Sequence, residues 1–248
     1  MKSASAEVGQ MQTPALFLPD ARPPRLTEEA KKAIRALAAF LHEDRPDPED
    51  LTQAYQTAVR LAGSEVEPRV VYGLILLKGR DRQKALSHFE QLRTDQPELW
   101  LAPQSLAWLR FSLRAYQAGV DELVQMVLRL PKPKTASAPW PEDLRNLFTW
   151  AGQLREFAAE GQETRQVSPE SLQKLDAAVA DCGEEPTQFY QQGREKTRSK
   201  LRDFDKQLFE ASDKATKLKI RIDRRQLSYF ASFPFTDATQ RVLAGMDR

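Results

Sequence analysis

The side chains that most often carry catalysis or bind metal ions are scarce in this chain of 248 residues. Its two histidines, His42 and His88, have no neighbour in the sequence at the spacing of a metal-ligand pair or a catalytic triad. The single cysteine, Cys182, precedes Gly183 at the end of a predicted helix, where the negative end of the helix dipole does not favour a thiolate. These side chains predict no catalytic, metal or cofactor site.

The acidic residues and glycines also lack the pattern of an enzyme. Acid pairs such as Asp203/Asp205 and Glu184/Glu185 are typical of any solvated helix surface. The sequence contains neither a glycine-rich phosphate loop nor a dinucleotide-binding fingerprint. We therefore expect a protein that is not an enzyme, although groups gathered only by the fold would escape this search.

Composition favours a helical protein with solvated outer faces, since 41% of the residues are hydrophobic and 29% are charged. The net charge of +2 is unevenly distributed: residues 186–248 hold 14 Lys and Arg against 8 Asp and Glu. The sequence has no secretory signal run near its start and nowhere 18 consecutive apolar residues. We expect a cytoplasmic protein with no membrane span.

Residues 27–131 show the three- and four-residue apolar spacing of amphipathic helices. Thr27, Asp47 and Asp81 stand where helix N-caps are expected, and Pro48 follows one of them at the first helical position. The stretch therefore predicts six helices joined as three hairpins.

Small and large positions in these hairpins recur every 34 residues. The recurring sets are Gly73, Ala85, Phe89, Leu92 and Pro97; then Ala107, Gly119, Leu123, Met126 and Pro131; and, one period earlier, Ala39, Leu51, Tyr55, Ala58 and Gly63. Small residues are needed where the two helices of a hairpin touch, and a proline stops the second helix.

This period resembles the tetratricopeptide repeat over residues 32–133. The copy at 66–99 has glycine, alanine, phenylalanine and proline at the spacing of that family, whereas the copy at 100–133 replaces the aromatic residue by Leu123. The copy at 32–65 departs further, because Leu51 stands where a small residue belongs. The resemblance implies an α-solenoid whose first helices line a concave groove.

The groove positions of the resembled family are mostly apolar in this sequence. The residues expected to line it are Phe40, Val70, Leu74, Leu77, Trp108 and Phe111. Such a surface could hold an apolar helix or an extended peptide of another protein. Alternatively, the carboxy-terminal helix of the chain itself fills the groove, since exposed apolar patches of several side chains are rare on monomers.

The rest of the chain divides by composition into four parts. We expect a flexible tail at 1–26, a proline-rich linker at 132–141, two helices at 142–185 that cap the last repeat, and a long basic helix with an aromatic end at 186–248. Within the last part, residues 217–223 also alternate with period two, so a short strand is the alternative there.

The long helix carries a heptad-like seam that resembles a coiled coil. The seam contains Leu201, Phe204, Leu208, Leu218 and Ile222. We expect it to be buried either against the chain's own helices or against a second copy in a homodimer.

The same helix presents a basic surface that includes Lys217, Lys219, Arg221 and Arg224. These residues could contact nucleic-acid phosphates or an anionic surface, but interspersed acids favour an ordinary solvated exterior. We therefore expect a non-enzymatic scaffold that binds a protein or peptide, with nucleic-acid binding as the alternative function.

Overall fold

The computed structural model describes residues 25–246 apart from 44, 80, 98, 100, 131–139, 160–166 and 234. The described residues form helices and contain no strand, which confirms the all-α class and makes 217–223 helical. The predicted tail at 1–26 and linker at 132–141 fall almost entirely outside the described residues.

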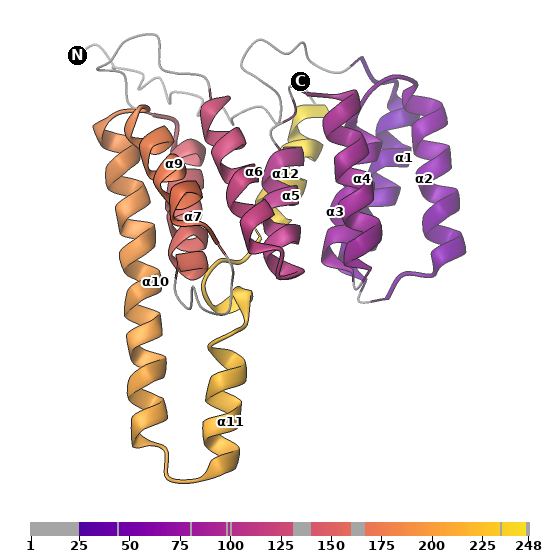
Figure 1. Ribbon diagram of the computed structural model, residues 1–248. Helices are drawn as coiled ribbons and strands as arrows, with labels where there is room; N and C mark the ends of the chain where they lie inside the picture. The colour runs from indigo at the N-terminus through magenta and orange to yellow at the C-terminus, as the bar shows by residue number, and fades with distance from the viewer. Residues whose placement is uncertain are drawn as a thin grey trace, which may run out of the picture.

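The first part of the chain forms consecutive helices that pair as hairpins (Figure 1). These elements are α1 (Glu28–Ala39), the 3-10 turn η1 (Phe40–His42), α2 (Pro48–Ala62), α3 (Glu67–Lys78), α4 (Arg82–Asp95), α5 (Leu101–Ser112) and α6 (Tyr116–Leu128). Helix α1 packs on α2, α3 on α4, and α5 on α6. Neighbouring hairpins meet where α3 packs on α1 and α2, and where α5 packs on α4.

Side-chain caps start several of these helices at the predicted residues. The Thr27 hydroxyl accepts a hydrogen bond from the Ala30 amide at 3.1 Å. The Asp81 carboxylate accepts one from the Lys84 amide at 3.0 Å, and Asp47 likewise caps α2. Each cap satisfies an amide that has no partner within its own helix.

Two of the recurring small residues lie where the helices of a hairpin touch. A Cβ atom added at Gly73 would lie 2.8 Å from the Phe89 ring, and one added at Gly119 would lie 2.5 Å from the Phe111 ring. Both distances are shorter than van der Waals contact, so each aromatic ring uses the space that glycine leaves.

The second part of the chain contains the longest helix and ends back on the first part (Figure 1). Its elements are α7 (Glu142–Ala159), α9 (Pro169–Ala180), α10 (Glu184–Glu210), α11 (Lys214–Asp223), the 3-10 turn η2 (Leu227–Tyr229) and α12 (Phe235–Met246). Helix α7 lies along α10, α9 packs on α6, and α12 packs on α3 and α1.

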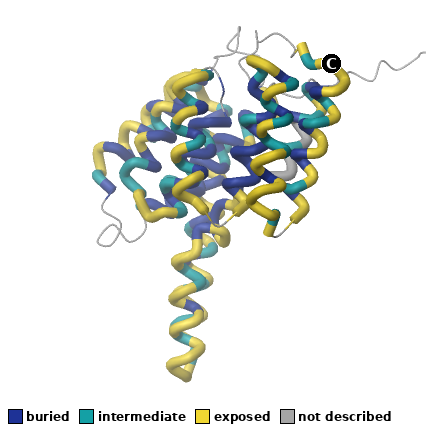
Figure 2. The backbone as a smooth tube through the Cα atoms, turned by 90° about the vertical axis from the view of Figure 1, so that its right-hand side faces the viewer, coloured by how far each residue is buried: buried dark blue, intermediate teal, exposed yellow. Residues whose placement is uncertain are grey.

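The long helix predicted to carry the whole seam from Leu201 to Ile222 is interrupted. Helix α10 ends at Glu210, and the chain turns back through Ala211, whose backbone is extended. Asp213 then caps α11 by accepting a hydrogen bond from the Thr216 amide at 2.8 Å. This cap starts a new helix, and α10 and α11 lie side by side as a hairpin (Figure 1). The hairpin extends away from the rest of the molecule (Figure 2).

The apolar core consists of two clusters. One contains residues of α1 to α5 together with Phe233, Ala238, Val242 and Met246. The other contains residues of α5, α6, α7, α9 and α10 together with Leu227, Phe230 and Ala231. Trp108 packs against both clusters, so the end of the chain passes from one half of the core to the other beside this side chain.

Candidate interaction surfaces

The predicted groove lies inside the molecule. Val70, Leu74 and Leu77 on α3 are buried in the first core cluster, and the half-buried Phe40 packs against that cluster. Of the other two predicted residues, both on α5, Phe111 is buried in the second cluster and the half-buried Trp108 packs against both clusters. The structure therefore does not present these side chains as one open surface.

The chain's own carboxy-terminal segment covers this region. The Trp108 indole N–H donates a hydrogen bond to the Ala231 carbonyl oxygen at 3.4 Å. The Trp108 ring also meets the Phe233 ring edge-on, with their centroids 6.0 Å apart. Beyond Phe233, the buried face of α12 lies in the same cluster as Leu74. The side chains of residues 230–233 and of α12, rather than those of the long basic helix, therefore pack beside Leu74 and Trp108.

The predicted seam is divided between the two helices of the α10–α11 hairpin. Leu201 is buried, and Phe204 is half-buried, with its ring centroid 5.7 Å from that of Tyr229. Leu218 and Ile222, by contrast, remain 59% and 51% exposed. Contacts within a single chain therefore bury the beginning of the seam and leave its end uncovered.

Helix α11 has one face that is both apolar and basic. Lys214, Leu218, Arg221 and Ile222 are spaced so that they share this face, and all four are exposed. Phe209, one residue before the end of α10, is 90% exposed near the turn of the hairpin. We call Lys214, Leu218, Arg221 and Ile222 the α11 stripe.

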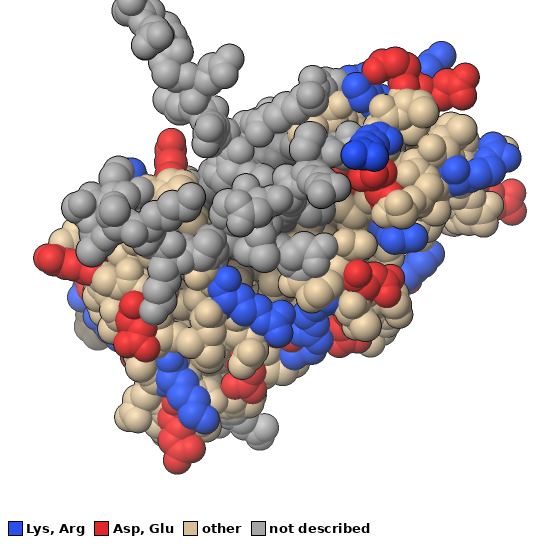
Figure 3. All heavy atoms as spheres, turned by 90° about the horizontal axis from the view of Figure 1, so that it is seen from above, with Lys and Arg blue, Asp and Glu red and all other residues tan. Residues whose placement is uncertain are grey.

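The four basic residues proposed for nucleic-acid contact do not share one face of α11. Lys219 lies on the opposite side of α11 from Lys217 and Arg221, since positions two apart on a helix do not share a face. Arg224 forms an ion pair with Asp205 of α10, with 3.0 Å between its Nε and the carboxylate. On the upper side of the molecule, acidic and basic side chains are interspersed (Figure 3).

The two histidines lie in different settings. His42 is exposed at the end of η1, whereas the half-buried His88 has its Nε2 2.8 Å from the Arg69 carbonyl oxygen. Burial lowers the pKa of His88, and its ring packs edge-on against Tyr72. Half-buried Cys182 donates to the Ala178 carbonyl oxygen at 3.4 Å. Within the described part of the chain, no three His, Cys, Asp or Glu residues cluster as a metal site.

A partly buried ion network that sequence reasoning missed joins α7, α9 and α10. Glu156 on α7 lies 3.0 Å from the Arg194 guanidinium and 2.7 Å from that of Arg198, both on α10. Asp176 on α9 accepts hydrogen bonds from Arg155 at 2.6 Å and from the Tyr190 hydroxyl at 2.7 Å. Burial raises the pKa of Tyr190, so this phenol stays protonated as a donor. The carboxylates and cations satisfy one another, which is typical of a structural network.

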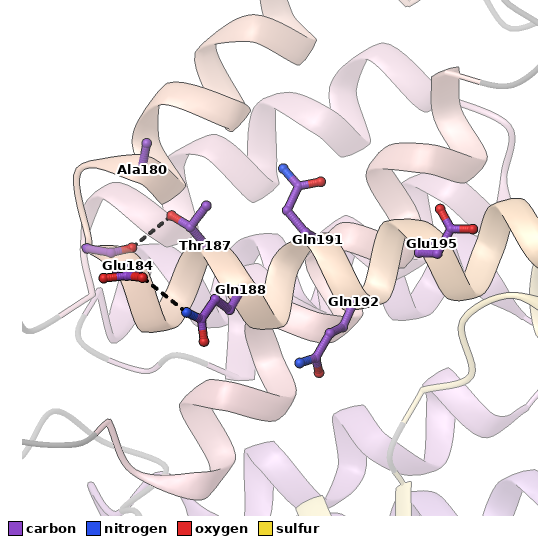
Figure 4. A pocket seen from close by; sticks show the side chains of 8 residues that line it. Ala180, Glu184, Thr187, Gln188, Gln191, Gln192 and Glu195 are labelled. Carbon is purple, nitrogen blue, oxygen red and sulfur yellow. Dashed lines mark hydrogen bonds between the residues drawn. The ribbon is translucent and has the colours of Figure 1, made fainter.

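A depression of about 680 Å³ lies along the beginning of α10 (Figure 4). Its side chains are mostly amides and carboxylates that project from successive turns of the helix. The Thr187 hydroxyl donates to the Gly183 carbonyl oxygen at 2.8 Å, and the Gln188 amide donates to Glu184 at 3.3 Å. These hydrogen bonds stay within the helix, so the depression offers no convergent set of groups for chemistry.

Comparisons with family models, curated proteins and solved structures gave no match. None of the described helices has an apolar stretch long enough to cross a bilayer. Function must therefore be argued from the surfaces of this chain.

Proposed function

We propose that this protein is a non-enzymatic scaffold that binds an acidic amphipathic helix of a partner protein on the α11 stripe. The main support for this proposal is that Leu218 and Ile222 are exposed on a hairpin that extends from the body of the molecule. Apolar side chains that remain exposed side by side are typical of an interaction surface.

The chemistry of the partner follows from the charges beside these apolar residues. Lys214 and Arg221 flank Leu218 and Ile222, and no described carboxylate forms an ion pair with either of them. A helix with leucines on one face and glutamates beside them would bury the apolar pair and neutralise the two cations.

The body of the molecule would serve as the support for this hairpin. We propose that residues 27–131 are a tetratricopeptide-like solenoid, which the 34-residue recurrence and the close packing at Gly73 and Gly119 support. In this protein the concave side would hold the chain's own carboxy-terminal segment, which moves the partner site to the hairpin.

Binding of a synthetic peptide tests the proposal. A fluorescent helix of alternating leucine and glutamate heptads should bind saturably, and the same helix with lysine in place of glutamate should not. Half-exposed Leu218 and Ile222 should each contribute about 1 kcal/mol when covered, so the double variant Leu218→Gln, Ile222→Gln should bind roughly thirtyfold more weakly.

The matched control is Lys196→Gln, which removes an exposed lysine from α10 instead of α11 and should bind the acidic peptide like the unmodified chain. Equal binding by the double variant would contradict the proposal. If sedimentation shows that the unmodified chain is a dimer and the double variant a monomer, the partner on the α11 stripe is a second copy of this chain rather than an acidic helix. Tighter binding of duplex DNA than of the peptide would favour the nucleic-acid alternative instead.

A further inference from the structure

A cavity of about 280 Å³ lies at the base of the hairpin, where four parts of the chain meet. The beginning of α4, the end of α5 with the turn to α6, the end of α7, and the segment that follows α11 each contribute to its lining. The lining includes three arginines and three aromatic residues that could contact a ligand: Arg82, Arg114, Arg225, Trp108, Tyr116 and Phe157. This cavity is separate from the α11 stripe.

The charge of the lining is entirely positive. Arg82, Arg114 and Arg225 line the cavity, whereas no aspartate or glutamate does. None of the three forms an ion pair with a carboxylate among the residues that the structure describes. This contrasts with the arginines around Glu156, which neutralise buried acids. A hollow lined by one sign of charge concentrates ions of the opposite sign.

Arg114 adopts a backbone conformation that is unusual for its residue type. Its φ is 64°, and among the described residues it is the only one other than glycine with a positive φ. This left-handed conformation is unfavourable for a bulky side chain and costs a glycine nothing. The conformation closes α5: the Arg114 amide donates to the Phe111 carbonyl oxygen at 3.0 Å, and the Ala115 amide donates to that of Arg110 at 2.8 Å. Glycine is the usual residue at this position of a helix end, so its replacement by arginine leaves a cation at the cavity that the turn itself does not need.

Aromatic rings supply the apolar part of the lining. Trp108, Tyr116 and Phe157 all line the cavity, and the last two rings meet edge-on with centroids 6.1 Å apart. The Arg82 guanidinium lies 5.9 Å from the centre of the Trp108 ring and donates to the Ser112 carbonyl oxygen at 3.0 Å. These contacts hold one cation beside the aromatic surface.

We propose that this cavity binds an aromatic phosphomonoester, with the phosphate among the three guanidinium groups and the ring against the aromatic side chains. Arginine pairs with phosphate through two parallel hydrogen bonds, and flat rings pack well on aromatic lining. The cavity is slightly smaller than those of drug-sized ligands, so it fits one ring and one phosphate better than an extended molecule. Either a free compound or a phosphotyrosine side chain offers this chemistry.

Calorimetric titration of the full chain tests the site with phenyl phosphate, inorganic phosphate and phenol as probes. Phenyl phosphate should bind most tightly, inorganic phosphate more weakly, and phenol without saturation. The variants Arg82→Gln, Arg114→Gly and Arg225→Gln should each weaken phenyl phosphate binding about tenfold. Arg60→Gln, which removes an exposed arginine from α2, is the matched control and should leave binding unchanged.

Arg114→Gly separates a ligand role from a structural one. Glycine accepts a φ of 64° without strain, so this variant should retain the midpoint of thermal unfolding while it loses binding. A short phosphotyrosine peptide that binds more tightly than phenyl phosphate would identify a protein side chain as the source, and weaker binding would identify a free compound. Equal affinity for phenol and phenyl phosphate, or unchanged affinity in all three arginine variants, would overturn the proposal.

Discussion

Glu67, the first residue of α3, is buried in surroundings that disfavour the ionised form of its carboxyl group. It is only 4% exposed, and its Oε2 has no hydrogen-bond partner among the described residues. Burial raises the pKa of Glu67, and the nearby Glu65 acts in the same direction. The folded state therefore binds a proton at Glu67 more tightly than the unfolded state does.

This raised pKa predicts a pH dependence of stability. The contribution of Glu67 is most favourable below about pH 4.3, the ordinary value for glutamate, and is lost as the pH rises through the raised folded pKa. Glu67→Gln should raise the free energy of unfolding at pH 7 by about 1 kcal/mol. The gain should disappear at low pH, and urea denaturation at several pH values measures it.

The exposed Glu43, which is in no α-helix, provides the control for that comparison. Glu43→Gln should change the free energy of unfolding little at any pH. If Glu67→Gln raised the free energy of unfolding equally at pH 4 and pH 7, the ionisation of Glu67 would not be the cause of the increase.

At the scale of elements, α7 and α10 cross with their backbones in direct contact at two glycines. A Cβ atom at Gly193 would lie 1.9 Å from the Thr149 carbonyl oxygen, and one at Gly152 would lie 2.1 Å from that of Tyr190. Neither backbone can yield without separating the helices. Gly193→Ala and Gly152→Ala should each lower the free energy of unfolding by about 3 kcal/mol, as measured by denaturant titration.

Gly245→Ala in α12 is the matched control, because a Cβ atom there would meet nothing within 4 Å. Alanine should stabilise that helix by up to about 1 kcal/mol. Unaltered stability of the Gly193 variant would mean that the two helices are further apart than described.

How far the elements can be predicted from sequence depends on whether their signal is local. The caps at Thr27, Asp47 and Asp81 are local, and each starts a helix as predicted. The contact face of α10 was missed at Gly193 and Thr197, because apolar periodicity does not mark a small or polar residue that is buried by close helix approach. The break before α11 was missed because the apolar spacing continues across it, although Asp213 is an ordinary cap.

At the scale of the whole molecule, the sequence alone allowed two alternatives for the apolar groove residues: a partner protein binds them, or the chain's own carboxy-terminal part covers them. Leu74 and Leu77 are both buried in the core, so they are not available to a partner as the groove hypothesis requires. The covering segment could not be read from the sequence, because Trp108 and Ala231 are far apart along the chain and their contact depends on every turn between them. The ion network around Glu156 was hidden for the same reason, as its members come from three helices.

Residues 230–233 and α12 contribute side chains to both core clusters. Detaching α12 should therefore lower the stability of the two clusters unequally. Val242 on α12 is 1% exposed and lies in the cluster of α1 and α3, while α7 and α10 belong to the other cluster. Val242→Asp would bury an unpaired carboxylate, so α12 should leave α3 and stability should fall by about 3 kcal/mol. Hydrogen exchange should then become faster in α1 and α3, with smaller changes in α7 and α10.

The exposed Ala244 lies two residues further along α12, and Ala244→Asp adds the same charge on its outer side. This control should leave hydrogen exchange in α1 and α3 unchanged. Equal acceleration in all four helices of the Val242 variant would show that the two clusters unfold as one unit. Because α12 is the only described element of the second part that packs extensively on α1 and α3, faster exchange confined to those helices would identify it as the cover of the groove.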